Sequence, residues 1–413
     1  MLVAILVGTA AGLTANAFGG GAPWLEWVLA HVAQPVGQIF LRLLFMLVVP
    51  VLFAALVVGV ASLELEDLGR MGLRMLGYTV VVSTIAVVIG LVLVDVVGPG
   101  RGASDSLREL ARQGTAIRPA AGSISLVTIV PMNPIKAAAD GDMIGLIFFS
   151  LFFGVGLALV RTEATARLRE AIEGLYEVSM RLIGLVLRVA PVGVAALLFS
   201  MTARLGADVL RQLAAYVGVV LFGLALQMGV VYSLSVWFLG GMSPREFFSG
   251  SRLAMVTAFS TASSSATLPT ALRVAEENLK LPPAVARFVL TAGSAMNQNG
   301  TALFEGVTVL FLAQLFGVPL GVWDQLGVMG ICILAGIGTA GVPAGSIPVV
   351  AMILQMYGIP LEGLGLILGV DRLLDMARTT VNVTGDLAAA VYVAGGARTD
   401  GAATTPASSR SAP

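Results

Sequence analysis

The chain has 413 residues, of which 57% are hydrophobic and 12% are charged, and its mean hydropathy is +0.94. A soluble domain carries roughly 25% charged residues, so this composition predicts a multi-pass membrane protein. The 24 basic and 24 acidic residues cancel, so the sequence shows no basic surface for nucleic acid. The single cysteine, Cys332, excludes a disulfide framework, and the lone His31, in a predicted connecting segment, argues against Ser–His catalysis and a histidine metal site.

Six membrane spans are predicted in the first 240 residues. The first is MLVAILVGTAAGLTANAF. Its Ala15-Asn16-Ala17 also fits a signal-peptidase site, but no basic region precedes it, so we favour a short span. The other five spans lie at about 35–63, 71–97, 142–160, 176–201 and 210–240.

Two segments are predicted to lie outside the membrane. Residues 101–141 include the polar GASDSLRELARQG and the proline-containing PMNPIK, which favour a surface loop. Residues 396–413 are a mixture of Gly, Ala, Thr, Ser and Pro that cannot bury a core, and they are predicted to be a disordered tail.

Two later segments of near-membrane hydrophobicity are interrupted by small polar residues. They are MVTAFSTASSSATLPTALRVA, broken at 263–265, and CILAGIGTAGVPAGSIPVVAMIL, broken around 338–346. Neither half can cross a hydrocarbon core of ~30 Å, which takes about 20 helical residues. Each break alone is also compatible with a water-exposed loop between short helices. Since paired interruptions are typical of inverted-repeat transporters, we predict two re-entrant hairpins that meet near the midplane.

The helix after the first hairpin, ARFVLTAGSAMNQNGTALFEGVTVLFLAQLFGV, is interrupted by NQNGT at residues 297–301. Glycine and amide residues there are expected to unwind the helix and turn backbone carbonyl groups inward, which is how buried alkali cations are coordinated. A kinked helix without a ligand is the alternative that the sequence leaves open.

The last apolar helix carries polar residues on one face. Asp371, Asp375, Arg378, Asn382 and Asp386 are 4, 3, 4 and 4 residues apart, which places them within roughly an 80° arc. A charged side chain that faces lipid at depth costs at least ~2.5 kcal/mol, so this face must line a site or pair internally. The alternative, a solvated helix end with surface ion pairs, is disfavoured by the apolar flanks.

These side chains suit an acidic amino acid. Arginine offers a planar fork for a carboxylate, and an aspartate one turn away can hold an ammonium group. The predicted helix N-termini at 263–265 and near Gly341 add N–H donors for a second carboxylate. Asp386 is then left to bind a cation together with carbonyl oxygens.

Four motifs in this order, SSSATLP, NQNGTALFEG, GTAGVPAGS and DMARTTVNVTGD, are highly specific. With FLRLLFMLVVPVLFAALVVGVASL in the second span, they cover nearly the whole chain. The sequence resembles the glutamate/aspartate transporters of the dicarboxylate/amino acid:cation symporter group, to which the neuronal excitatory amino acid carriers also belong.

The resemblance implies a role for each matching residue. Arg378 would bind the substrate side-chain carboxylate with help from Thr301, and Asp375 would bind the amino group, which favours aspartate or glutamate over C4-dicarboxylates. The other implied substrate-binding residues are Ser264, Ser265, Gly341, Val342, Pro343, Thr379 and Asn382. The implied sodium ligands are Gly293, Asn297, Asn382 and Asp386 at one site, with the backbone around Ile337 and Thr339 at a second.

Three departures from the family pattern affect ion coupling. Sodium-coupled members read Asn-Met-Asp-Gly-Thr where this chain has Gln298 and Asn299, and Val82 replaces a threonine, so we expect a third sodium site to be weak or absent. Glu305 stands where the proton-coupled carriers place their proton-carrying glutamate; a structural glutamate held by hydrogen bonds is the alternative. The family's extra arginine is missing, since Ala262 and Met376 occupy its two known positions, which argues against potassium countertransport.

The resemblance also implies an all-helical fold: eight transmembrane helices and two re-entrant hairpins in inverted repeats, assembled as a homotrimer in the inner membrane. Residues 1–69 and 142–206 would form a scaffold, and residues 70–100 and 207–395 a transport domain that moves as an elevator. The protein would be a symporter driven by Na⁺ and/or H⁺, without a cofactor, and not an enzyme.

The sequence leaves two alternative functions to compare with this expectation. A C4-dicarboxylate symporter shares the fold but has no use for an amino-binding Asp375. An intramembrane serine hydrolase built on residues 263–265 would need a general base, and neither a placed histidine nor an obvious Ser–Lys pair is available.

Overall fold

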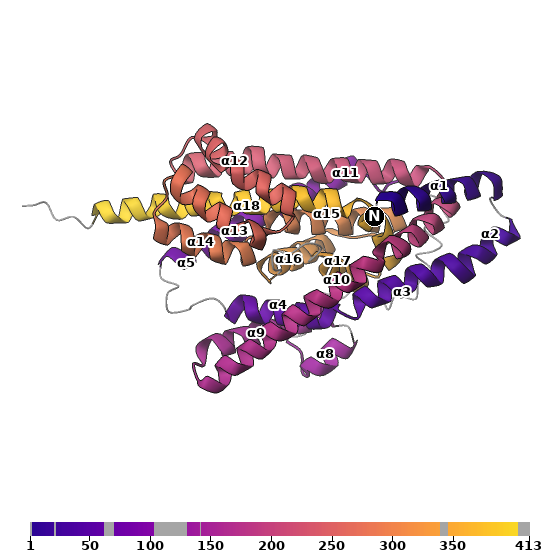
Figure 1. Ribbon diagram of the computed structural model, residues 1–413, viewed down its shortest axis with the longest axis horizontal. Helices are drawn as coiled ribbons and strands as arrows, with labels where there is room; N and C mark the ends of the chain where they lie inside the picture. The colour runs from indigo at the N-terminus through magenta and orange to yellow at the C-terminus, as the bar shows by residue number, and fades with distance from the viewer. Residues whose placement is uncertain are drawn as a thin grey trace, which may run out of the picture.

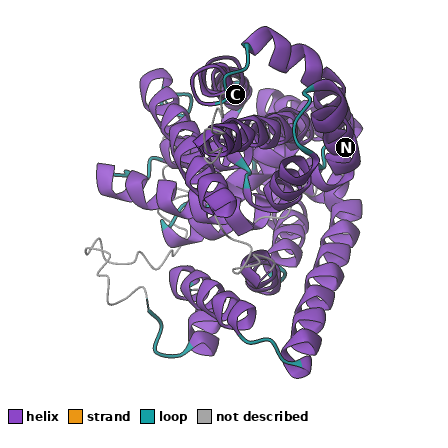
Figure 2. Ribbon diagram, turned by 90° about the vertical axis from the view of Figure 1, so that its left-hand side faces the viewer, coloured by secondary structure: helices purple, strands orange, loops and turns teal. Residues whose placement is uncertain are grey.

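The structure is a computed structural model that describes residues 2–19, 22–61, 70–102, 130–140, 142–338 and 346–403. Every regular element among these residues is a helix, which confirms the predicted all-helical class. In Figure 1 most helices run along the long axis of the molecule, and α18 (Leu364–Ala403) passes through its middle. Figure 2 shows the bundle from one end.

The N-terminal elements are α1 (Leu2–Gly19), α2 (Pro23–Val28), the π-helical η1 (Leu29–Ala33), α3 (Gln34–Phe45), α4 (Val48–Ala61) and α5 (Arg70–Val97). They match the first three predicted spans. The prediction of a connecting segment around His31 is wrong, because the helix already starts at Pro23. The fixed φ of proline suits the first helical position, and no later residue stops the helix before α3.

The predicted surface loop at 101–141 contains a short, largely exposed helix, α8 (Pro134–Asp140), which the sequence analysis did not predict. Pro134 stands at the start of the helix, and the Asn133 side-chain oxygen accepts hydrogen bonds from the backbone N–H of Ile135 (3.0 Å) and Lys136 (3.1 Å). These contacts cap a helix that composition alone did not reveal. Residues 103–129 and 141 lie outside the described residues.

The next two helices are α9 (Met143–Leu159) and α10 (Glu163–Leu205). α9 agrees with its predicted span, whereas α10 has 43 residues and begins well before the predicted 176–201. Its polar first turns are stabilised by a capping box between Thr162 and Thr165 and by an ion pair between Glu163 and Arg167. Hydropathy detects only the apolar part of such a helix.

The predicted span at 210–240 is formed by α11 (Asp208–Leu226), η2 (Gln227–Tyr232) and η3 (Ser235–Leu239). The segment of the first predicted hairpin contains α12 (Pro244–Thr261) and α13 (Ser264–Arg273), which pack against each other, and α13 continues into η4 (Val274–Asn278). The break between these helices lies where the sequence predicts it.

The helix that follows is interrupted as predicted: α14 (Pro283–Met296) and α15 (Asn299–Phe316) are separated by two non-helical residues, Asn297 and Gln298. The second pair of short helices is α16 (Val322–Gly338) and α17 (Ser346–Met356), and residues 339–345 between them lie outside the described part of the chain.

A short 3-10 turn, η5 (Leu361–Gly363), leads into α18. This helix continues to Ala403, through the first part of the segment 396–413 that we predicted to be disordered. No proline occurs between Leu364 and Pro406, and the alanines extend the helical hydrogen-bond pattern despite two glycines, Gly396 and Gly401. Residues 404–413 are outside the described range.

The helices pack in two groups, which contact each other through α10 with α18 and α4 with α16. α1, α3 and α4 pack on α10, and α9 packs on α4. The second group contains α5 and α11 to α18, and almost every residue of α15 is buried within it, against α5, α11, α16 and α18. The apolar residues of α15 therefore serve as a core, while polar residues at its N-terminal end meet α18.

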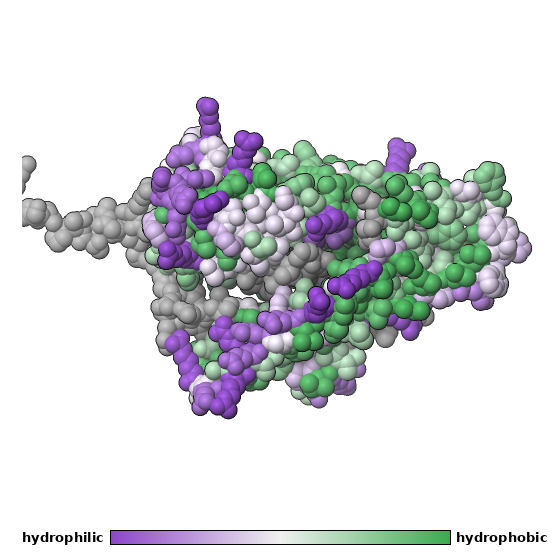
Figure 3. Space-filling view, viewed as in Figure 1, coloured by the Kyte–Doolittle hydropathy of each residue, from purple (hydrophilic) through white to green (hydrophobic). Residues whose placement is uncertain are grey.

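Among the described residues, five helices are long and apolar enough to cross a membrane: Pro23–Ala61, Met71–Val97, Glu163–Arg204, Asp208–Leu239 and Pro283–Phe316. Shorter apolar helices add to them, including Gly145–Leu159 and Ser346–Met356. In Figure 3 hydrophobic residues cover the middle and right of the visible face, and hydrophilic residues gather at the left-hand end. This distribution is that of a multi-pass membrane protein.

Candidate substrate and cation site

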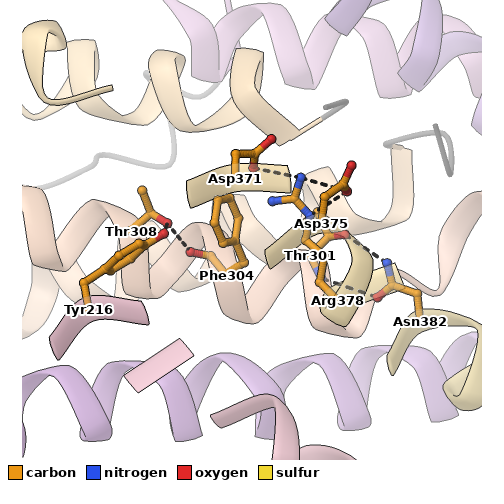
Figure 4. Close-up of polar contacts among 8 residues, drawn as sticks. All are labelled: Tyr216, Thr301, Phe304, Thr308, Asp371, Asp375, Arg378 and Asn382. Atoms are coloured by element: carbon orange, nitrogen blue, oxygen red, sulfur yellow. Dashed lines mark hydrogen bonds and ion pairs between the residues drawn. The ribbon is translucent and has the colours of Figure 1, made fainter. Parts of the chain in front are cut away.

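The polar face of α18 points into the protein. Its members are all buried, with exposed fractions of 7% or less: Asp371, Asp375, Arg378, Asn382 and Asp386. The structure therefore brings together the residues that the sequence placed within one arc, and the solvated-helix alternative does not describe them. In Figure 4 Arg378 and Asn382 lie beside Phe304 and Thr301 of α15, and Asp371 and Asp375 lie beside the Arg378 guanidinium.

Arg378 is the most deeply buried charge on this face, at 1% exposed. Its Nε and Nη2 both lie 3.0 Å from Asp375 Oδ1, and Nη2 lies 3.2 Å from Asp371 Oδ1. The guanidinium carbon also stands 4.2 Å from the ring centroid of Phe304, a cation–π contact with α15. Two carboxylates and one aromatic ring thus hold the guanidinium in a fixed orientation (Figure 4).

The outer nitrogen of Arg378, Nη1, has no hydrogen-bond partner among the described residues although it is buried. A buried donor without a partner is costly, and an arginine fork binds a carboxylate through two parallel N–H groups. The edge formed by Nη1 and Nη2 is therefore the part of the guanidinium on which a ligand carboxylate can dock.

Asn382 joins α18 to the break between α14 and α15. Its Oδ1 accepts hydrogen bonds from the backbone N–H of Gly300 (2.7 Å) and Thr301 (3.4 Å). Its Nδ2 donates to Thr301 Oγ1 (3.0 Å) and to Gln298 Oε1. Both hydrogens and both lone pairs of the amide are used, so any ligand that binds Asn382 must replace one of these partners.

Asp386 lies one turn further along α18, beside the C-terminal end of α14. Its Oδ1 accepts a hydrogen bond from Asn297 Nδ2 at 2.9 Å, and Asn297 Oδ1 is buried without a hydrogen-bond partner in the described structure. A Cβ added to Gly293 would lie 2.7 Å from Asp386 Oδ1, so only glycine leaves room for this carboxylate. A buried carboxylate, an amide oxygen and helix-end carbonyls are oxygen ligands that suit an alkali cation.

A second polar cluster surrounds Asn299, and the described hydrogen bonds of this cluster involve no carboxylate. Ser83 Oγ donates to Asn299 Oδ1, Asn299 Nδ2 donates to Tyr232 OH (3.2 Å), and Tyr232 OH donates to the backbone oxygen of Val381 (3.1 Å). This neutral chain of hydrogen bonds, which we name the Asn299 network, joins α5, α15, η2 and α18.

The tip between α12 and α13 is capped locally. Ala262 adopts a left-handed conformation (φ 49°), and the Ser263 side chain accepts a hydrogen bond from Ala266 N at 3.2 Å. Ser264 is buried and its Oγ has no hydrogen-bond partner among the described residues, whereas Ser265 is exposed. α13 packs against α18, so the tip belongs to the same part of the molecule as the arginine.

Six predicted site residues are not among the contacts described above. Thr379 is buried on α18, and Ile337 lies in the last turn of α16. The remaining four, Thr339, Gly341, Val342 and Pro343, lie outside the described residues.

Glu305 is completely buried on α15, and neither carboxylate oxygen has a hydrogen-bond partner among the described residues. The structural alternative, a glutamate held by hydrogen bonds, therefore receives no support from the described contacts. Arg378 is close enough to attract it electrostatically. Desolvation of this kind favours the neutral form of a carboxyl group.

Sequence reasoning missed three contacts of the site: the Asp371 carboxylate on Arg378, the Phe304 ring, and Gln298 on Asn382. Asp371 was visible on the polar face but received no role of its own. Phe304 lies three residues after Thr301, on the same side of α15, and this spacing is the one signal that could have indicated it.

An apolar helical bundle with a buried, charged and partly unpaired site beside two helix breaks defines a membrane transporter rather than an enzyme. A sequence model of the sodium:dicarboxylate symporter family matches residues 1–395, and the chain belongs to this family. It is therefore a multi-pass protein of the cell membrane.

Individual relatives agree with this membership. The chain is 34% identical over 387 residues to the proton/glutamate-aspartate symporter of Escherichia coli (strain K12), covering 89% of this chain and 86% of that protein. It is 33% identical over 396 residues to the proton/sodium-glutamate symport protein of Geobacillus stearothermophilus, with 94% and 92% covered. Similarity extends to excitatory amino acid transporter 1 of Ambystoma tigrinum, at 31% identity over 405 residues, with 85% and 74% covered.

Proposed function

We propose that this protein is a secondary symporter that takes up L-glutamate or L-aspartate together with cations. The observation that carries the proposal is the Arg378 guanidinium, which is buried beside Asp375 and has its Nη1 unpartnered among the described residues. A carboxylate acceptor completes this arginine, and the neighbouring aspartate suits an amino group. The names of the relatives support the same substrate class and coupling by protons and sodium.

The substrate would lie between α15, α18, the break between α12 and α13, and the break between α14 and α15. Its side-chain carboxylate would dock on Arg378 with help from Thr301, and its amino group on Asp375. The α-carboxylate would use Asn382 and N–H groups of the hairpin tips. The tip and helix residues proposed to line this end are Ser264, Ser265, Gly341, Val342, Pro343 and Thr379.

Cation binding would involve the region next to the substrate. Asp386, Gly293, Asn297 and Asn382 supply the oxygens of one proposed sodium site, supported by the unpartnered Asn297 Oδ1. The backbone around Ile337 and Thr339 would form a second. Since the Asn299 network has no carboxylate, we expect no third sodium ion there. Glu305 is the proposed proton carrier because it is buried in apolar surroundings.

The proposed assembly is a homotrimer whose subunits work as elevators, with eight spans and two hairpins in inverted repeats. Residues 1–69 and 142–206 would form the scaffold, and residues 70–100 and 207–395 the moving transport domain. The extensive packing of α1, α3 and α4 on α10, and of α15 on α5, α11, α16 and α18, supports this division, although α10 also contacts α18 and α4 also contacts α16.

Uptake of radiolabelled substrate into liposomes that contain the purified protein tests the function. L-Aspartate, L-glutamate and succinate are compared under an inward sodium gradient and, separately, under an acidic exterior without sodium. Amino acid uptake in the parent that is lost in Asp375→Ala supports the proposal. Succinate uptake that survives Asp375→Ala, with no amino acid uptake in the parent, would instead establish a C4-dicarboxylate symporter.

The same assay separates the two coupling ions. Uptake driven by the proton gradient alone and lost in Glu305→Gln identifies Glu305 as a proton carrier. Strict sodium dependence that is unchanged in Glu305→Gln assigns coupling to the Asp386 region. Glu163→Gln is the matched control, because this carboxylate has an 82% exposed side chain at the N-terminal end of α10 and lies outside the site.

A further inference from the structure

Asp371 has no role in the mechanism described above, yet it is one of the two carboxylates in contact with Arg378. It is 7% exposed, and its Oδ1 lies 3.2 Å from Arg378 Nη2 in an ion pair, which is the one distance between the two side chains that the described contacts include. Asp375, in contrast, accepts a well-formed hydrogen bond from Nε and also lies 3.0 Å from Nη2. Asp371 is therefore the weaker of the two partners.

The two carboxylates lie on different edges of the guanidinium. Asp375 covers the edge formed by Nε and Nη2. Asp371 contacts the other edge, formed by Nη1 and Nη2, through Nη2 alone. A substrate carboxylate that binds this edge through two N–H groups takes the position of Asp371 and leaves Asp375 in place.

We propose that the substrate carboxylate displaces Asp371 from Arg378 and that Asp371 then takes up one proton from solution. This inference rests on the proposed function, in which Arg378 binds the substrate. The ion pair between Asp371 and Nη2 is broken, new N–H···O bonds form to the substrate, and the Asp371 carboxylate becomes a neutral carboxylic acid. One proton thus enters the site with each substrate molecule.

Asp371 takes up a proton because a buried carboxylate that has lost its cationic partner is unfavourable and is neutralised by a proton. The groups that act electrostatically on Asp371 are Arg378, Asp375 and Arg372 on α18, and an electrostatic interaction also links it to Tyr216 on α11. Asp375 is a like charge, and the Tyr216 hydroxyl is engaged with Thr308 Oγ1 at 2.8 Å.

Two further charged residues in the described part of the chain act on Asp371 or on Arg378: Arg372 and Glu305. Arg372 is exposed, so solvent screens its charge more than that of Arg378. Glu305 acts on Arg378 from α15 rather than on Asp371 itself. Neither group replaces the ion pair that Asp371 loses. The 10% exposure of the Asp371 side chain gives protons access to it.

Isothermal titration of the purified full-length protein with L-aspartate between about pH 5.5 and 8 tests the proposal, since the substrate carboxylates themselves do not titrate in this window. Sodium concentration is held constant. The variants are Asp371→Asn, Asp371→Glu and Glu305→Gln, and Glu163→Gln is the exposed control. If Asp371 takes up one proton when the substrate binds, the logarithm of the Kd for L-aspartate rises by about one for each unit of increasing pH.

We expect Asp371→Asn to lower this slope by about one, because an amide cannot take up the proton. We also expect it to bind aspartate more tightly than the parent at the alkaline end, because asparagine competes for Arg378 without a charge. A gain in affinity cannot result from misfolding. Asp371→Glu retains the slope, and Glu305→Gln leaves the contribution of Asp371 in place.

An unchanged slope in Asp371→Asn, or weaker binding by this variant at every pH, overturns the inference while the proposed function stands. A pH-independent Kd in the parent overturns it as well. If the parent binds none of L-aspartate, L-glutamate and succinate, the proposed function fails, and the inference fails with it.

Discussion

The break between α12 and α13 and the break between α14 and α15 differ in which residues form hydrogen bonds with their polar groups. At the break between α12 and α13, the capping bonds come from the same hairpin: Thr267 Oγ1 donates to the Ser263 backbone oxygen at 2.8 Å, and Ser263 Oγ accepts from Ala266 N at 3.2 Å. At the break between α14 and α15, Asn382 supplies the partners from a helix more than 80 residues away in sequence.

This difference separates a self-supporting break from a dependent one. A hairpin tip that caps its own backbone keeps its shape when its neighbours move. The α14–α15 break has local bonds, such as Gln298 Nε2 to Ser294 O, but the N–H groups of Gly300 and Thr301 depend on Asn382 of α18. The proposed cation site and the substrate arginine therefore belong to one connected unit. The following substitutions test the comparison in order of expected effect.

Asn382→Ala breaks the link between α18 and the dependent break. The N–H groups of Gly300 and Thr301 and the Gln298 side chain lose a buried partner. We expect the free energy of unfolding to fall by about 3 kcal/mol, measured by titration with sodium dodecyl sulfate in mixed micelles. Asn278→Ala is the control, because this exposed amide makes a bond to Gly250 O at 3.0 Å and should cost less than about 0.5 kcal/mol. Equal losses in both variants would contradict the dependence on α18.

Gly293→Ala tests the same break at its cation side. The added Cβ would lie 2.7 Å from Asp386 Oδ1, which must then move away from Asn297. We expect a loss of about 2 kcal/mol in the free energy of unfolding and a higher sodium concentration for half-maximal uptake. Gly184→Ala on α10, with no atom within 4 Å of the new Cβ, is the control. Unaltered sodium dependence in Gly293→Ala would count against a cation beside Asp386.

Ser263→Ala removes the local cap of the self-supporting break. We expect a loss of about 1 kcal/mol, the usual contribution of an N-cap, without an effect on the α14–α15 break. Ser243→Ala is the matched control, because Ser243 caps α12 with the same 3.2 Å bond to a backbone N–H and lies away from the tip. If Ser263→Ala costs as much as Asn382→Ala, the two breaks do not differ in the way described here.

The local signals in the sequence predicted both breaks and the polar face of α18. Serines before a helix, NQNGT inside an apolar helix and a 4-3-4-4 spacing of polar residues each act over a few residues. The helix α8 and the first turns of α10 were missed because polar residues formed caps and ion pairs there, which hydropathy does not detect.

The partners of the site residues could not be predicted in the same way. Gln298 on Asn382, Ser83 on Asn299 and Phe304 under Arg378 are contacts between helices that lie far apart in sequence. Such contacts depend on how helices are packed and rotated, which residue spacing within one helix does not fix. The shared contact of Asp371 and Asp375 with Nη2 depends on side-chain conformation in the same way.

The hydrogen bonds of the Asn299 network should be insensitive to the salt composition of the buffer. Ser83, Asn299, Tyr232 and the Val381 carbonyl carry no formal charge, so the bonds that join α5, α15 and α18 need no counter-ion. Their strength does not vary with the ionic strength of the buffer, unlike that of exposed ion pairs. The unliganded transporter should therefore keep these helices joined in choline chloride, a buffer in which its resting conformation can be studied without any alkali metal.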